Sequence, residues 1–166
     1  YFPRVVPESE GISSEKLTQM LRELAAARHT DMHHLLVLRN GHVICECNFA
    51  PYRSGIWHAT YSMCKSITGM AVGFLISEGK LSLDENVYDI FEKRNGLLQK
   101  ILRPNLTVEH LLTMKSGVQF NEMGVVSGND WVDSFLNAPV KGTPGEAFEY
   151  NSMNTYLLSA IIQERT

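Results

Sequence analysis

The segment that decides the fold runs from Tyr61 to Ser77 and reads YSMCKSITGMAVGFLIS. Apolar side chains recur along it at the helical spacing of three and four residues, at Ile67, Met70, Ala71, Phe74 and Leu75. The opposite side is also small or apolar, so the pattern predicts a helix over Ser62–Ser77 that is buried on all sides. Lys65 is the only charged residue in this helix.

Ser62 and Lys65 form a Ser-x-x-Lys pair one helical turn apart, so both side chains lie on the same face. A lysine in a fully buried helix loses hydration, which makes a neutral amine accessible that can take the proton of a hydroxyl. Ser62 lies in the first turn, where the helix dipole favours an alkoxide or an oxyanion. The structural alternatives are a helix cap for Ser62 and a surface-reaching side chain for Lys65. The combination favours Ser62 as a nucleophile.

The same pattern occurs twice more, at Ser13–Lys16 and at Ser77–Lys80. Ser13 precedes a surface helix among several glutamates, so Lys16 is expected to be solvated. Ser77 lies at a helix end that Gly79 stops. Both pairs are therefore predicted to be structural.

Tyr150 is the second candidate for proton transfer. It follows a Pro144-Gly145 turn and lies just before a predicted helix. A tyrosine in such a place is more often a core or rim residue. A phenol beside an ammonium group can, however, have a lowered pKa and relay protons between a nucleophile and a leaving group.

The remaining pattern predicts an α+β fold with its strands early and its helices late. The expected elements are a helix from Ser13 or Ser14 to about Arg28, strands at 35–38 and 43–49 joined by an Asn40-Gly41 turn, a helix from Thr107 to about Met114, a polar loop at 121–130, a short helix at 131–136, a turn region at 139–145 and a closing helix at 154–164. We divide the chain into 1–60, with a helix and strands, and 61–166, mainly helical. Two strands need more sheet than this chain contains, so the fold is predicted to be incomplete.

Composition excludes several classes of function. The chain has 166 residues, enough for one domain, and a net charge of -3 without a basic stripe, which excludes nucleic acid as a partner. The longest charge-free apolar stretch lies within Ile67–Ser77, far below the about 20 residues that span a bilayer. No basic-then-apolar leader follows Tyr1, so no signal peptide is expected.

The three cysteines, Cys45, Cys47 and Cys64, do not form a disulfide pattern. We expect reduced thiols, which favours a cytoplasmic location. A metal site from Cys45, Cys47 and the pair His33-His34 is an alternative, but the spacing matches no zinc pattern and small residues on a strand explain the cysteines. We therefore expect no metal.

Three blocks of the sequence, 61–66 (YSMCKS), 106–117 (LTVEHLLTMKSG) and 144–152 (PGEAFEYNS), resemble the serine beta-lactamase-related family. The resemblance is greatest to its branch of class C beta-lactamases, penicillin-binding proteins, esterases and D-aminopeptidases. It implies a beta-lactamase/transpeptidase-like fold and an acyl-enzyme formed at Ser62 from an amide, ester or lactam, without a metal or an organic cofactor. It also implies that Lys65 and Tyr150 share the proton transfers.

The chain departs from the family pattern in two places. Ser152 stands where the Tyr-x-Asn motif of the family has its substrate-binding asparagine, and Asn151 is the neighbouring candidate for that role. The third family motif, Lys-Thr-Gly or a relative, follows the tyrosine, whereas Lys115-Ser116-Gly117 precedes it and is predicted to be a helix stop.

The resemblance therefore predicts an N-terminal half of the domain, either truncated or paired with its C-terminal half as a separate chain. The expected substrate is a small acyl compound, and membranes are not expected as partners. An alternative function is a penicillin-type sensor or pseudoenzyme that binds or is acylated without turnover.

Overall fold

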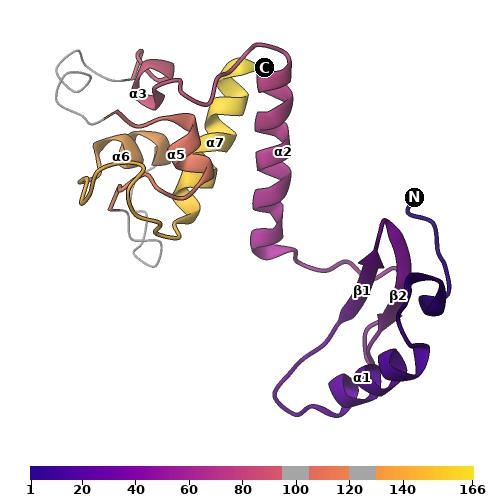
Figure 1. Ribbon diagram of the computed structural model, residues 1–166. Coiled ribbons are helices and arrows are strands. Elements are labelled where there is room, and N and C mark those ends of the chain that lie inside the picture. The colour runs from indigo at the N-terminus through magenta and orange to yellow at the C-terminus, as the bar shows by residue number, and fades with distance from the viewer. Residues whose placement is uncertain (95–104, 120–129) are drawn as a thin grey trace. The chain divides into compact units, whose positions relative to one another are not determined.

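The computed structural model of the protein describes residues 1–94, 105–119 and 130–166 (Figure 1). The chain forms two compact units, Tyr1–Ala59 and Thr60–Thr166. Among the described residues, none of the helices has both the length and the apolar character that crossing a bilayer requires.

The first unit contains a helix and one strand pair. After the short 3-10 helix η1 (Pro7–Glu10), α1 spans Ser14–Ala26, and the Ser13 hydroxyl caps it by accepting a hydrogen bond from the backbone of Lys16. Strands β1 (His34–Arg39) and β2 (His42–Asn48) pair antiparallel. Asn40 and Gly41 join them with φ angles of 49° and 79°, as a tight hairpin turn requires. The predicted helix and hairpin are confirmed.

The second unit is helical. The short 3-10 helix η2 (Tyr61–Met63) leads into α2 (Cys64–Ser77), followed by α3 (Val87–Ile90), α5 (Val108–Leu112), α6 (Trp131–Asn137) and α7 (Ser152–Arg165). The helices predicted at 62–77, 107–114, 131–136 and 154–164 correspond to α2, α5, α6 and α7, with ends that differ by at most two residues, whereas α3 was not predicted. Of the loop predicted at 121–130, only Asp130 is among the described residues, and its side chain caps α6.

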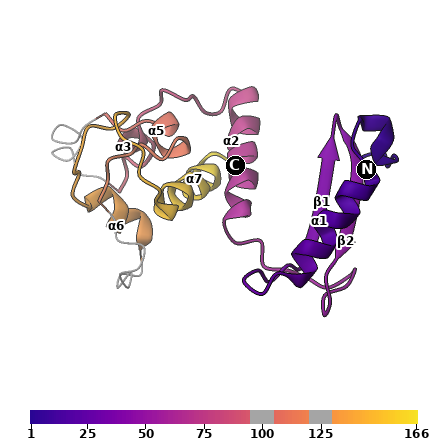
Figure 2. The same ribbon diagram turned by 60° about the horizontal axis from the view of Figure 1, so that its bottom comes forward.

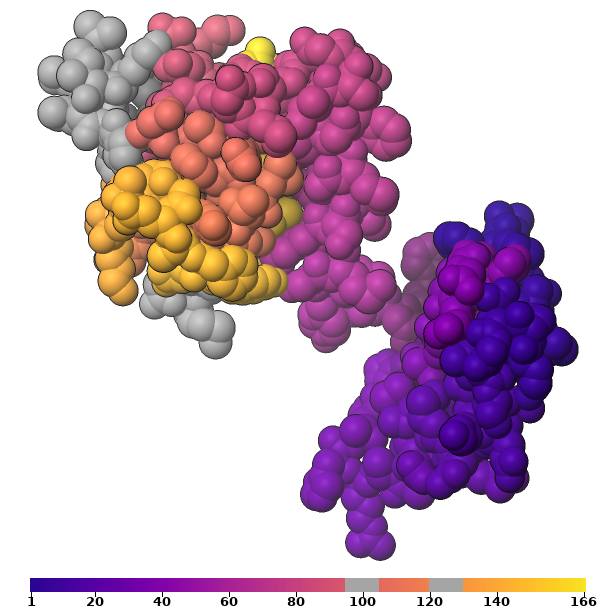
Figure 3. Space-filling view, viewed as in Figure 1, coloured from indigo at the N-terminus to yellow at the C-terminus, as the bar shows by residue number. Residues whose placement is uncertain are grey.

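Helix α7 is the centre of the second unit. It packs against α2, α5 and α6, and both ribbon views place α2 alongside it (Figures 1 and 2). Leu157 and Ile161 of α7 are fully buried with Phe135 of α6 and Leu111 of α5. On the face drawn in Figure 3, little of α7 is visible because earlier segments of the second unit lie in front of it. The core therefore holds the N-terminus of α7, where Tyr150 precedes the helix, at a fixed place relative to α2.

The prediction that α2 is buried on all sides is wrong. Val72 and Leu75 are buried against the core, whereas Ile67, Met70 and Phe74 are 62%, 59% and 68% exposed. These three lie at i, i+3 and i+7 and thus on one face of the helix. An apolar pattern predicts that a face can be buried, but it does not say which segment covers it.

We expect Phe135→Ala to lower the free energy of unfolding by about 3–5 kcal/mol, because a fully buried ring leaves a cavity. Phe148→Ala is the matched control, since Phe148 is 66% exposed and its loss should cost less than about 0.5 kcal/mol. Denaturant unfolding measures both values, and equal losses would contradict this placement of the core.

Candidate active site

Three predicted residues meet at one oxygen atom in the second unit. The Lys65 ammonium group donates a hydrogen bond to Ser62 Oγ over 3.0 Å, and the Tyr150 hydroxyl donates to the same oxygen over 2.7 Å. Lys65 Nζ also lies 5.1 Å from the centroid of the Tyr150 ring, within the range of a cation–π interaction. The structure thus brings the nucleophile candidate into contact with both proton-transfer candidates.

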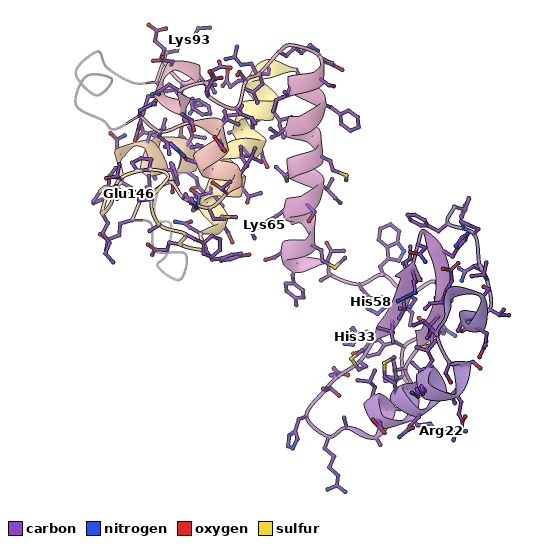
Figure 4. The ribbon with its side chains drawn as sticks, in the orientation of Figure 1. Arg22, His33, His58, Lys65, Lys93 and Glu146 are labelled. Carbon is purple, nitrogen blue, oxygen red and sulfur yellow. The ribbon has the colours of Figure 1, made fainter. Side chains whose placement is uncertain are left out.

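The entrance to α2 positions Ser62 and Lys65. Ser62 lies within η2, one residue before Met63 and two before the start of α2, so the predicted helix start at Ser62 is replaced by a tighter turn. Tyr61, directly before Ser62, has a φ of 45°, an uncommon left-handed conformation for a residue with a side chain. Lys65 lies in the first turn of α2, on the side toward α7 (Figure 4).

A turn after α5 positions Tyr150. The backbone N–H groups of Glu149 and Gly145 donate to the carbonyl oxygens of Met114 and Lys115 over 2.9 Å and 2.8 Å. Upstream, the N–H of Lys141 donates to the carbonyl of Gly117 over 2.9 Å. The predicted helix stop Lys115-Ser116-Gly117 is therefore also a backbone platform that holds the segment carrying Tyr150.

The pKa of Tyr150 is lowered from its ordinary value. The largest cause is the hydrogen bond with Lys65, followed by the hydrogen bond with Ser62; partial burial opposes them, and a further hydrogen bond with Ser152 adds to the lowering. Each of these contacts favours the phenolate over the phenol. Tyr150 is thereby the group of the site whose environment favours loss of a proton.

The site is more open than the sequence predicted. Lys65 is half-buried, Ser62 is exposed, and Tyr150 is 51% exposed. The expectation of a lysine enclosed within the protein is therefore wrong. The expected contact between the Lys65 amine and the Ser62 hydroxyl is present.

The two candidates for substrate binding, Asn151 and Ser152, have different positions. Asn151 is buried, and its side-chain oxygen caps α7 by accepting a hydrogen bond from the backbone of Met153 over 2.9 Å. Ser152 is the first residue of α7 and is half-buried. Substrate binding by either residue stays a prediction.

Sequence reasoning missed Asn154, a fully buried carboxamide on α7. Its Nδ2 donates to Met114 Sδ over 3.4 Å, so it contacts the residue whose carbonyl supports Glu149. The signal for it was an asparagine four residues after Tyr150 within an apolar helix.

The other two Ser-x-x-Lys pairs are structural, as predicted. The Ser13 hydroxyl accepts a cap hydrogen bond from the Lys16 backbone. The Ser77 hydroxyl donates to the Phe74 carbonyl over 2.8 Å, and Lys80 forms an ion pair with Glu78. In these hydrogen bonds, the partner of each serine hydroxyl is a backbone group and not the side-chain amine of the lysine.

No metal-ligating group of three His, Cys, Asp or Glu residues occurs in the part of the chain that the structure describes. The three cysteines are free, and burial raises the pKa of Cys45. His34 contacts Asn48. His33 contacts His58, and Figure 4 labels these two histidines.

The sequence pattern of the beta-lactamase family matches residues 17–166. The chain belongs to the beta-lactamase family. Protein flp of Staphylococcus aureus is 33% identical over 116 residues, which cover 63% of this chain and 22% of that protein. The sequence therefore supports the family that its three blocks resemble.

Solved structures agree on the fold of this beta-lactamase family member. A Bacteroides dorei protein assigned as a beta-lactamase superimposes with a TM-score of 0.74 at 18% identity, over 92% of this chain and 46% of that one. FmtA of Staphylococcus aureus gives 0.67 at 14% identity, over 99% and 46%. The hydrolase EstCE1, which has promiscuous acyltransferase activity, gives 0.62 at 18% identity, over 95% and 47%. At these identities the likeness shows the fold alone, and the chain spans less than half of each structure.

We expect Gly117→Ala to lower the free energy of unfolding by about 1–3 kcal/mol, because Gly117 has a φ of 66° and an added Cβ would lie 2.6 Å from the carbonyl oxygen of Gly142. Gly142→Ala is the matched control, since its Cβ would meet nothing within 4 Å. Denaturant unfolding compares the two variants. A Gly117→Ala protein as stable as Gly142→Ala would show that the platform does not hold the Tyr150 segment closely.

Proposed function

We propose that this chain carries the acylation site of a serine hydrolase that acts on an amide, ester or lactam. The observation that carries the proposal is the meeting of Lys65 and Tyr150 at Ser62 Oγ. A nucleophile within hydrogen-bond reach of a base, with a further group orienting that base, is the arrangement that covalent catalysis requires. Membership of the beta-lactamase family and the fold shared with EstCE1 support it.

In the proposed first step, Ser62 Oγ forms a bond to the substrate carbonyl carbon while its proton passes to the phenolate oxygen of Tyr150. Lys65 donates a hydrogen bond to Ser62 Oγ, and its hydrogen bond with the phenol is the largest cause of the lowered pKa of Tyr150. Tyr150 then returns the proton to the leaving nitrogen or oxygen as the carbonyl re-forms. An ester of Ser62 remains.

The proposed second step is hydrolysis of this ester. Tyr150, again ionised, takes a proton from water, whose oxygen attacks the acyl carbon, and Ser62 leaves with that proton. The oxyanion formed in each step needs hydrogen-bond donors. We assign one to the backbone N–H of Ser62, since the first N–H groups of a helix have no acceptor within it.

Intact mass after incubation with a fluorophosphonate tests Ser62. We expect one covalent adduct on the protein, its loss in Ser62→Ala, and its retention in Ser77→Ala, the matched serine of a structural Ser-x-x-Lys pair. An adduct that persists in Ser62→Ala would remove the nucleophile assignment.

The alternative, a sensor that is acylated without turnover, rests on Ser152 in place of the family's asparagine. An activated ester separates the two functions. Steady release of product supports the hydrolase, whereas a single burst equal in amount to the protein supports the sensor.

We further propose that the functional form includes the remainder of the beta-lactamase domain, on this chain or on a separate one, packed against the exposed face of α2. That face is apolar at Ile67, Met70 and Phe74, and water disfavours its exposure. The chain spans 42–47% of the solved relatives with which it shares the fold, which leaves a comparable length to supply the cover.

Phe74→Lys tests this contact. In the chain of 166 residues we expect a change in the free energy of unfolding within about 0.5 kcal/mol, because the ring is exposed. In a protein that includes the remaining domain we expect a loss of roughly 2 kcal/mol or more, because a charge would be buried there. A small change in both would contradict the cover, and a dimer of the short chain that Phe74→Lys dissociates would assign the face to a second copy.

A further inference from the structure

Two histidines of the first unit meet at a place that the proposed acylation chemistry does not use. His33 lies directly before β1, and His58 lies at the end of the loop 49–58 that follows β2. Their Nδ1 atoms are 3.2 Å apart. His58 is exposed and the His33 side chain is 42% exposed, so an ion from solvent can reach both rings.

The loop that carries His58 is folded back onto the start of β1. The N–H of Phe49 donates to the His33 carbonyl over 3.1 Å, and the N–H of Tyr52 donates to the Phe49 carbonyl over 2.8 Å. The Tyr52 ring stacks on the His33 ring, with centroids 3.6 Å apart and an angle of 26° between the planes, and lies 5.5 Å from the His58 ring. Backbone and ring contacts thus hold the two imidazoles near each other (Figure 4).

Asp31 acts on the opposite side of the His33 ring. Its Oδ2 lies 3.4 Å from Nε2 of His33. A carboxylate at this nitrogen favours the tautomer with the proton on Nε2, which leaves a lone pair on Nδ1, the atom that faces His58. The same order of carboxylate, imidazole and metal orients the histidine ligands of most metal sites.

The spacing of the two Nδ1 atoms fits a shared metal ion. Zinc binds imidazole nitrogen at about 2.0–2.1 Å in tetrahedral geometry, which places two such ligands about 3.3 Å apart. In a contact between two neutral imidazoles, one Nδ1–H must donate to the other Nδ1. When His58 instead carries its proton on Nε2, the Nδ1 lone pairs of both rings are available to one ion. Imidazole ligands favour zinc, copper and nickel over magnesium and calcium.

We propose that His33 and His58 bind one divalent transition-metal ion, Zn²⁺ or Cu²⁺, through their Nδ1 atoms, and that Asp31 orients His33. Two protein ligands leave the other coordination positions to water, in keeping with the lack of a group of three ligating residues in the described part of the chain. The ion ties the residue before β1 to the end of the loop 49–58. It takes no part in the proposed acylation, and the inference does not rest on that function.

The test measures metal binding by the chain of 166 residues, prepared without a histidine tag. Zn²⁺ is titrated calorimetrically, with Mg²⁺ as the comparison. We expect one Zn²⁺ per chain and no binding of Mg²⁺. His33→Ala and His58→Ala should each reduce the Zn²⁺ affinity more than tenfold, because one of two ligands is lost, and Asp31→Ala should reduce it by roughly tenfold, the effect of a group that orients a ligand.

His34→Ala is the matched control. His34 is the next residue along the chain, but its Nδ1 contacts Asn48 Oδ1 over 2.9 Å, so its loss should leave the Zn²⁺ affinity unchanged. A variant with Cys45→Ser and Cys47→Ser should also bind normally, which separates this site from the thiols. Zn²⁺ binding that is lost in either control and kept in His33→Ala overturns the proposal, as does a wild-type protein that takes up neither Zn²⁺ nor Cu²⁺.

Electron paramagnetic resonance of the wild-type protein loaded with Cu²⁺ is a second readout that does not depend on how a variant folds. We expect coupling of the copper to two imidazole nitrogens, reduced to one in His33→Ala and in His58→Ala. A spectrum with sulfur ligands or without nitrogen coupling overturns the site. Neither measurement uses catalysis, so failure of the proposed hydrolase and failure of this metal site are told apart.

Discussion

The site depends on one oxygen atom, Ser62 Oγ, which accepts hydrogen bonds from both the Lys65 ammonium and the Tyr150 hydroxyl. The Lys65 and Ser62 side chains lower the pKa of Tyr150, with the hydrogen bond to Lys65 as the largest cause and the hydrogen bond to Ser62 next. In a half-exposed site water screens charges, so contact geometry decides the acidity of the phenol more than net charge does. Small displacements of Lys65 or Tyr150 therefore matter.

That geometry joins residues 88 positions apart in the sequence. Backbone hydrogen bonds to Met114, Lys115 and Gly117 hold the Tyr150 segment, while the buried side chains of α7 fix the other end of the same turn. Backbone hydrogen bonds can form with most side chains at the positions involved. Gly117 is an exception, because the backbone of Gly142 approaches it so closely that only glycine fits. The position of Tyr150 thus depends on the turn at residues 114–117, which itself contributes no catalytic side chain.

Local signals made much of this predictable from the sequence. The Asn40-Gly41 turn and the helix starts near Ser13 and Thr107 depend on signals within a few residues and occur as expected; the side chains of Ser13 and Thr107 cap those helices. The burial of α2 was not predictable, because periodicity identifies an apolar face but not its neighbour.

The exposure of α2 and the openness of the site have a common physical consequence. Tyr61 and Met63, on either side of Ser62, are 84% and 73% exposed, so apolar surface extends from the nucleophile along α2 to Phe74. Covering that surface removes water next to Ser62, and in a drier environment each hydrogen bond and each charge at the site has a larger effect. The chain by itself already aligns Ser62, Lys65 and Tyr150. Covering this surface would therefore strengthen the electrostatic interactions at the site rather than align its side chains. Completion of the domain should then affect the reaction rate more than the arrangement of Ser62, Lys65 and Tyr150.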